Sequence, residues 1–456
     1  MSLDERPKDE LNTINTIRQK RAYVFSRYLT DPINGSRLED IRNVLVIISA
    51  SRSGSSLLYH LLSGHPDVLA PMGEEITLYK LAGLGAIDSL NDSHAIAEDV
   101  PLDPIQREAL ALDILSDAGC PHLAVEADFP VETYVTNCVQ RLLLQWPEID
   151  FDCDELYLSA KRALEKHLST NKAFDAAQYW LDLLSNLISQ GYVINPYFYD
   201  LSQELIKHRH PSIQIPEGPP FSKLCLEEPP FIVPQPRVFP QADSHLNKCL
   251  LLKSSSNCYR IGFMKKLYPN ARFSFIYLTR NPAGAINGLM DGWLSNGFYS
   301  QNLGDLTTLE IDGYSLPNKP WSQHWWNFDS PPGWINYVDK PLENVCAFQW
   351  RSANEYVIKN IGNGIIDRYL IIKYEDMLNQ ESLRRQLTKV LDFAQLDPQP
   401  ILNEFKAPVY VMTVNPPAPK KWMKRRDIIM PALMDSDVIS VASSLNYDIK
   451  TAEEFV

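Results

Sequence analysis

The chain of 456 residues is poor in positive charge and has no long apolar run. It contains 43 Lys and Arg residues against 56 Asp and Glu residues, which gives a formal net charge of −13. This deficit argues against a general nucleic-acid-binding protein, because phosphate backbones select basic faces. The densest apolar run near the start covers only residues 44–48, whereas a bilayer span needs ~20 residues. We therefore expect neither a nucleic-acid partner nor a membrane span.

Cysteine is scarce and scattered. The 7 cysteines include no CxxC pair, and no cluster of His and Cys has the spacing of metal ligands. This pattern predicts reduced, mostly buried thiols and no bound metal. The first ten residues, MSLDERPKDE, are charged and lack the apolar core of a secretory signal. Both features lead us to expect a cytoplasmic protein.

What the chain does contain is a recurring alternation of strand-like and helix-like segments. Apolar, often β-branched runs are followed each time by polar residues and then by helical spacing. The runs cover residues 41–49, 249–252, 273–278 and 369–372. This alternation predicts an α/β fold with a central parallel sheet, in which ligands bind beyond the carboxyl ends of the strands.

Two segments depart from this rhythm and suggest the domain organisation. Residues 1–40 form a leader that is helical over 9–30. We expect this helix to cap the domain, and a role in dimerisation is the alternative. The protein is accordingly expected to be a monomer or a homodimer. The α/β domain then covers 41–456, interrupted at 80–245 by a mainly helical insertion. Nine of the 33 prolines fall within 211–240, which predicts an ordered loop across a surface, because proline excludes helix and central strand.

A short polar loop follows the first predicted strand. Residues 50–56 read ASRSGSS and lead into a helix, so their backbone N–H groups and the helix dipole favour an anion. A nucleotide-hydrolysing loop would read GxxxxGK[ST], but here Ser55 stands in place of the lysine and Ala50 in place of the first glycine. An ordinary polar turn is the alternative. The candidate phosphate ligands are Ser51, Arg52, Ser53, Gly54, Ser55 and Ser56.

Four elements in order resemble the sulfotransferases that use 3′-phosphoadenosine-5′-phosphosulfate (PAPS). The resemblance is best to the tyrosylprotein and related bacterial enzymes, and it covers about 45–75 and 245–430. The elements are SRSGSSLLYHLLSGHPDVLAPMGEE (51–75), FSFIYLTRNPAGAINGLM (273–290), Trp350 with Asn354 before YLIIKYEDML (369–378), and KKWMKRR (420–426). The resemblance implies a P-loop-type three-layer sandwich and PAPS as the cofactor, with 3′-phosphoadenosine-5′-phosphate (PAP) as its product.

The resemblance also implies roles for individual residues. Glu75 matches the catalytic base, with Glu74 as its competitor, and a carboxylate can serve if its pocket raises its pKa. Lys253 and Arg52 would stabilise charge on the leaving phosphate. Arg280 would hold the 3′-phosphate through its planar guanidinium.

The remaining residues expected to contact the cofactor match the family pattern less closely. Gly288 stands where the family usually has a serine, and Ala283 where an arginine is common, which leaves the 3′-phosphate contacts in doubt. Asn287 could donate its amide instead. A solvated charge run is the alternative for the basic cluster near 420–426. The expected cofactor residues beyond the loop and Arg280 are Asn287, Gly288, Tyr374, Lys421, Trp422, Lys424 and Arg425.

The charge is unevenly distributed along the chain. Residues 74–243 carry a net charge of −16, whereas the rest carries +3. One hypothesis is that the insertion covers a polar, cationic acceptor such as an amine- or guanidine-bearing specialised metabolite; a solvated acidic surface is the alternative. Four tryptophans within 321–334 would line an acceptor pocket or form an aromatic core. The alternatives to a sulfotransferase are a P-loop kinase or NTPase and a catalytically idle nucleotide-binding scaffold.

Overall fold

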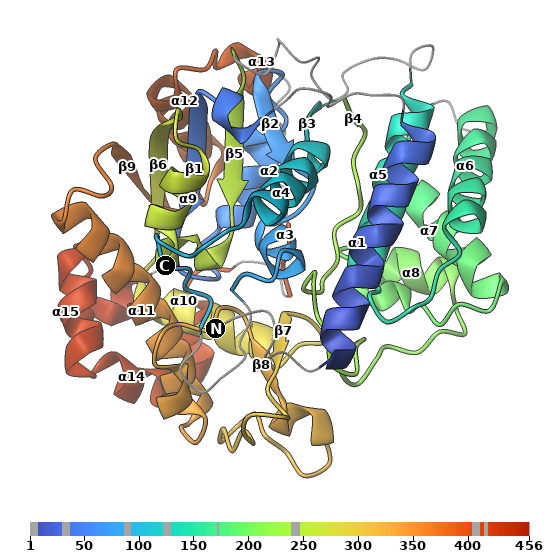
Figure 1. The fold of residues 1–456 in the computed structure, drawn as a ribbon. Coiled ribbons are helices and arrows are strands. Elements are labelled where there is room, and N and C mark those ends of the chain that lie inside the picture. Colours follow the sequence, from blue (N-terminus) through green and yellow to red (C-terminus); the bar gives the residue numbers. More distant parts are fainter. Residues whose placement is uncertain are drawn as a thin grey trace.

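The computed structural model describes residues 8–29, 37–85, 93–121, 129–170, 173–238, 247–403, 411–414 and 418–455. A seven-stranded sheet lies at the centre of the α/β part (Figure 1). From edge to edge its strands are β4 (Arg237–Val238), β3 (Ala118–Pro121), β2 (Val68–Pro71), β5 (Cys249–Lys253), β1 (Asn43–Ile48), β6 (Arg272–Thr279) and β9 (Tyr369–Lys373). The five strands from β2 to β9 are parallel, β3 pairs antiparallel with β2, and β4 pairs antiparallel with β3. The predicted α/β fold with a mainly parallel sheet is confirmed.

The central strand β1 is buried on both faces, as its apolar sequence predicts. Its alternate residues enter two different cores. Leu45 and Ile47 pack with helices α2 (Ser55–Leu62) and α12 (Gln380–Ala394) on one face. Val44 and Val46 join the larger core on the other face, which includes α9 (Ile261–Leu267) and α11 (Leu342–Gly362). The sheet is therefore the middle layer of a three-layer sandwich.

The remaining helices and a small second sheet complete the described elements. These helices are α1 (Lys8–Tyr28), α3 (Ile76–Leu81), α4 (Pro104–Asp117), α5 (Val131–Gln145), α6 (Cys153–Thr170), α7 (Ala176–Ser189), α8 (Gln203–Arg209), α10 (Pro282–Trp293), α13 (Gln399–Leu402), α14 (Arg426–Leu433) and α15 (Ser436–Ser444). The second sheet pairs β7 (Tyr299–Asn302) with β8 (Trp325–Asn327).

The stretch predicted as an insertion is mainly helical up to Arg209, where α8 ends. It also supplies β3 and β4, which the sequence pattern did not predict because they have only four and two residues. The stretch is therefore joined to the central sheet by backbone pairing. Its residues 86–92, 122–128, 171–172 and 239–245 lie outside the described part of the chain.

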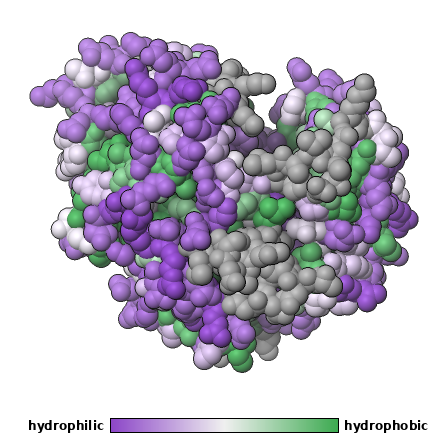
Figure 2. Space-filling model, turned by 90° about the horizontal axis from the view of Figure 1, so that it is seen from above, coloured by the Kyte–Doolittle hydropathy of each residue, from purple (hydrophilic) through white to green (hydrophobic). Residues whose placement is uncertain are grey.

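The predicted leader helix is α1, and Figure 1 shows it beside α5 and α6, with which it is in contact. Its side chains Ile14, Ile17 and Val24 are buried there. Arg21 adds an ion pair with Asp113 of α4 at 3.0 Å. The apolar side of the helix is thus used within the chain, against the helical region. Seen from above, a hollow separates that region from the α/β part (Figure 2).

The proline-rich loop and the tryptophans are both more buried than segments on the protein surface would be. The loop after α8 has no helix up to β4, as predicted, but it buries Leu226, Glu227 and Phe231 and so crosses the interior. Trp326 and Trp334 are fully buried in the larger core, which makes the aromatic-core interpretation correct. None of the helices in the described ranges is long and apolar enough to cross a membrane.

Candidate active site

The loop between β1 and α2 lies at the carboxyl edge of the sheet and lines a cavity. Arg52 and Gly54 have left-handed backbone conformations, with φ of 64° and 91°, which turn the chain tightly into α2. No side chain caps the first turn of α2, whose residues are all described. The first-turn N–H groups and the helix dipole therefore remain available for an anion.

Glycine at position 54 is required by the ring of Tyr374. A Cβ atom there would lie 2.5 Å from Cδ2 of the tyrosine, besides having to adopt a positive φ. On this ring lies the guanidinium of Arg280, 4.3 Å from the ring centroid. Trp350 supports the arrangement by donating its indole N–H to the backbone oxygen of Arg280 at 3.2 Å. The predicted residues of three distant segments thus meet at one wall of the cavity.

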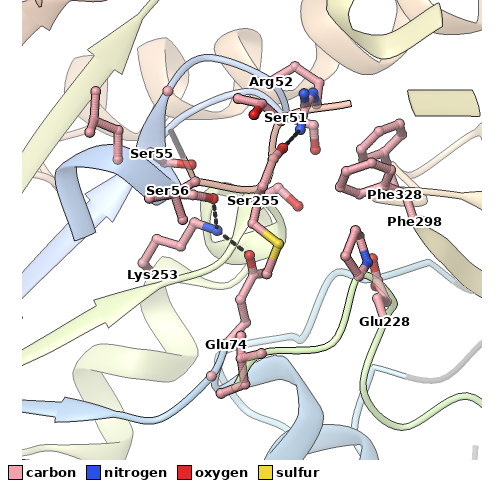
Figure 3. Close-up of a pocket in the computed structure, with 18 of the residues that line it drawn as sticks. Ser51, Arg52, Ser55, Ser56, Glu74, Glu228, Lys253, Ser255, Phe298 and Phe328 are labelled. Carbon is pink, nitrogen blue, oxygen red and sulfur yellow. Dashed lines mark hydrogen bonds and ion pairs between the residues drawn. The ribbon is translucent and has the colours of Figure 1, made fainter. Parts of the chain in front are cut away.

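Lys253 projects from the end of β5 toward the same loop (Figure 3). Its ammonium donates to the hydroxyl of Ser56 at 3.0 Å and forms an ion pair with Glu74. Lys253, Ser56 and Glu74 all line the cavity. A cation, a hydroxyl and a carboxylate are therefore held together at the point where the parallel strands end.

Glu75 lies behind this group and does not line the cavity. Its side chain is fully buried, with one oxygen accepting from the backbone N–H of Lys253 at 3.1 Å and the other from the amide of Asn257. Burial raises the pKa of Glu75 above its usual value, although the Asn257 bond opposes this. The expected base is thus placed to hold the end of β5, whereas its competitor Glu74 reaches the cavity.

Positive charge in the cavity is not fully compensated. Arg52 donates to the backbone oxygen of Met412 at 2.8 Å, and Arg280 donates to the backbone oxygen of Arg52 at 2.7 Å. Within the described ranges, neither guanidinium has an ion pair, and the Nε atom of each is buried without a partner. Burial, together with the charge of Arg280, lowers the pKa of Arg52 to about 10. An anion between these groups would relieve both effects.

One serine of the loop already uses its hydroxyl in a hydrogen bond within the protein. The hydroxyl of Ser51 donates to Asp329 at 2.8 Å, and the hydroxyl of Tyr259 donates to the other carboxylate oxygen at 2.7 Å. Asp329 is buried, which raises its pKa to about 6. Ser51 therefore anchors the loop, whereas Ser55 and Ser56 line the cavity and are the candidate hydroxyls for binding an anion.

A model of the sulfotransferase family matches residues 45–339 of the sequence. The match covers well over half of the chain and includes the loop, Lys253 and Arg280. The chain belongs to the sulfotransferase family. None of the curated proteins matches the sequence.

Two solved structures resemble this sulfotransferase. The sulfotransferase domain from the Synechococcus PCC 7002 olefin synthase has 18% identity and a TM-score of 0.37, covering 91% of this chain and 99% of that domain. A sulfotransferase domain from the curacin biosynthetic pathway has 14% identity and a TM-score of 0.36, covering 90% of this chain and 99% of that domain. The family assignment rests on the family model alone.

The basic cluster near the C-terminus lies beyond the residues matched by the sulfotransferase model. Lys421 and Arg425 both pair with Asp291 of α10 at 2.6 Å, and Lys424 is exposed. Trp422 is buried beneath them, as expected. None of these residues lines the cavity in this structure. The cluster is anchored on α10 near the predicted 3′-phosphate site.

Gly288, where the sequence resemblance leads us to expect a serine, lies against the two cavity arginines. A Cβ atom at this position would lie 3.2 Å from Cβ of Arg52 and 3.5 Å from a terminal nitrogen of Arg280. A serine here would therefore be tight against Arg52 and in ordinary van der Waals contact with Arg280. The neighbouring Asn287 accepts a hydrogen bond from Arg425 at 2.8 Å and does not line the cavity.

Several cavity residues were missed by sequence reasoning, among them Glu228, Phe298 and Phe328. Glu228 comes from the proline-rich loop, and Phe298 and Phe328 come from the irregular region after α10. Neither region has a periodic pattern, so only the acidic pair at 227–228 and its following prolines gave a signal. This side of the cavity is therefore built by loops.

None of the cysteines, and none of the histidines within the described ranges, lines the cavity. The seven cysteines form no disulfide, and six are buried, so the predicted burial of the thiols is confirmed. His65 accepts a local hydrogen bond from the backbone N–H of Asp67 at 3.0 Å. The described residues contain no group of three or more His, Cys, Asp or Glu that could hold a metal ion.

Proposed function

We propose that this sulfotransferase uses PAPS and transfers its sulfuryl group to a small acceptor. The supporting observation is the pair of guanidinium groups, Arg52 and Arg280, which face the cavity without an ion pair in the described ranges beside the uncapped first turn of α2. A doubly phosphorylated nucleotide supplies the anions that such a site favours.

When bound, PAPS supplies a sulfuryl group whose bond to the 5′-phosphate breaks as a new bond forms to the acceptor oxygen or nitrogen. The chain's own residues provide the surrounding electrostatics. Lys253, Ser56 and the N–H groups of α2 stabilise negative charge on the phosphate, and Arg52 adds to them. Arg280 and Tyr374 hold the nucleotide side of the site.

We propose Glu74 as the base that accepts the acceptor's proton, in place of Glu75. Glu74 lines the cavity and contacts Lys253, whereas Glu75 is fully buried and both its oxygens already accept hydrogen bonds. Glu75 is then a positioning residue that fixes the backbone of Lys253.

Binding of PAP tests the cofactor. PAP should raise the melting temperature of the protein by a few degrees, because it binds only the folded state. ATP with Mg²⁺ is the comparison ligand for a kinase or NTPase, which the absence of a loop lysine disfavours. ATP hydrolysis without a response to PAP would refute the proposal in favour of an NTPase. PAP binding without sulfation of any compound in a cell extract supplied with labelled PAPS would indicate a scaffold.

The adjacent glutamates offer a matched pair of variants. Glu74→Gln should lower turnover of the acceptor found in that extract by about 10²–10⁴-fold, the usual contribution of a general base. Glu75→Gln should cost less, because the new side chain can still accept from Lys253. PAP affinity should change little in either variant. The reverse order of the two losses would restore Glu75 as the base.

A further inference from the structure

The wall of the cavity that faces Lys253 is apolar. Figure 3 shows Phe298 and Phe328 across the cavity from Lys253, with Glu228 beside them. The two rings are stacked, with centroids 4.6 Å apart and planes inclined by 24°. Pro229 and Pro230 of the proline-rich loop line the cavity next to them. On one side the wall meets the phosphate-binding loop, because the guanidinium of Arg52 lies 5.0 Å from the ring centroid of Phe298.

The two phenylalanines are held in unfavourable backbone conformations. Their φ angles are 64° and 62°, in the left-handed region that bulky residues rarely adopt. Residues with a side chain are disfavoured in this region, so the surroundings must hold them there. The backbone N–H of Phe298 donates to Pro229, and that of Phe328 donates to the oxygen of Phe298 at 3.0 Å. Such strain is typical of side chains that are aimed at a ligand.

The carboxylates of the cavity are all compensated. Glu74 pairs with Lys253, and Glu227 pairs with Arg141 at 2.8 Å. Glu228 lies 3.5 Å from the buried ammonium of Lys80 and accepts from the hydroxyl of Ser300 at 2.6 Å. The acidity of the 74–243 stretch therefore gives the cavity no spare negative charge among the lining residues described. A cationic acceptor would find no free partner here.

We propose that Phe298, Phe328, Pro229 and Pro230 form the acceptor subsite and that it takes a neutral acceptor with an apolar body. The body lies on the aromatic pair, and its hydroxyl group points toward Glu74. This inference rests on the proposed function, and it replaces the hypothesis of a cationic acceptor. Burial of the apolar body against the rings supplies the binding free energy.

Two matched pairs of probes separate the two classes of acceptor without needing turnover. 4-Ethylphenol and tyramine differ only by an ammonium group, as do hexan-1-ol and 6-aminohexan-1-ol. Binding is measured by isothermal titration with and without saturating PAP, so the acceptor subsite is assessed whether or not PAP binds. We expect the neutral member of at least one pair to bind about tenfold tighter or more, because the ammonium must be desolvated without a free carboxylate.

Variants connect the affinity to the aromatic wall. Phe298→Leu and Phe328→Leu should each weaken binding of the neutral probe about tenfold, through lost ring contact. The shift in melting temperature that PAP produces should stay unchanged in Phe328→Leu, which also shows that this variant folds, and should fall only slightly in Phe298→Leu, whose ring packs on Arg52. Phe348→Leu is the matched control, because Phe348 stacks on Tyr337 at 3.9 Å and does not line the cavity.

Four results would overturn this assignment. Tighter binding of the amines, lost in Glu228→Gln, would identify a cationic acceptor. Loss of the PAP shift in the phenylalanine variants would assign the rings to the nucleotide. A neutral-probe affinity that falls equally in Phe348→Leu would remove the special role of the wall. Failure of every probe to bind, with the PAP shift intact, would reject the subsite while leaving the proposed function in place.

Discussion

The arginines around the cavity fall into two groups. Arg141 is fully buried between Asp117 and Glu227, at 2.5 and 2.8 Å, and Gly73 lies against it. Burial alone would lower its pKa, but the two carboxylates raise it overall. Among the described residues, the guanidinium groups of Arg52 and Arg280 donate only to backbone oxygens and lie on aromatic rings, and burial lowers the pKa of both. The ion-paired guanidinium of Arg141 stabilises the fold, whereas those of Arg52 and Arg280, which have no ion pair among the described residues, are available to an anion.

Arg141→Met should produce the largest effect, and that effect should be on stability. The change leaves Asp117 and Glu227 buried without their cation, which costs about 3–5 kcal/mol of unfolding free energy. Urea unfolding measures it. Arg426→Met is the control, because the exposed pair of Arg426 with Glu453 is worth at most about 1 kcal/mol. Equal losses in the two variants would erase the distinction between the two groups of arginines.

Arg280→Met should affect binding instead. The free energy of unfolding should change by less than about 1 kcal/mol, since no ion pair is broken among the described residues. PAP affinity should fall by about 10- to 100-fold, the value of a charged hydrogen bond. Calorimetric titration with PAP provides the measurement, and Lys389→Met, which alters an exposed lysine of α12, should leave the affinity nearly unchanged. A destabilised protein that binds PAP normally would place Arg280 in the structural group.

The buried carboxylate Asp329 offers a test by pH. Burial raises its pKa from 3.8 to about 6, so the folded protein binds more protons than the unfolded chain between these values. Its contribution to stability is complete below pH 3.8 and is lost as the pH rises through 6. Asp329→Asn should remove this loss, which thermal unfolding between pH 4 and about 7 would reveal. An unchanged pH profile would mean that Asp329 is not the titrating group.

Gly288→Ser should have the smallest effect. The added Cβ forces Arg52 to move by a few tenths of an ångström, at a cost of about 1 kcal/mol or less. We expect PAP affinity to fall by up to about fivefold, which corresponds to that energy. A gain in affinity would show that the usual serine of the family can still be accommodated beside the two cavity arginines.

Sequence reasoning reached the parts of the site that lie on regular structure. The long apolar runs of β1, β5, β6 and β9 predicted a parallel sheet, and strand ends then brought the phosphate loop, Lys253 and Arg280 together. Which of Glu74 and Glu75 reaches the cavity could not be predicted, because it depends on the backbone conformation between the end of β2 and the start of α3. Phe298 and Phe328 were beyond reach, since their position depends on backbone strain and long-range packing rather than on periodicity.

The order of the sheet has a consequence for synthesis of the chain. Strand β1 ends at Ile48, yet both of its neighbours come much later, β5 at Cys249 and β6 at Arg272. At typical elongation rates of about 5–20 residues per second, more than 200 residues take roughly ten to fifty seconds to be added. During this interval the nascent chain exposes both edges of an apolar strand. Folding of the sheet edge that lines the cavity must therefore wait for the second half of the protein, and chaperones have that interval in which to act.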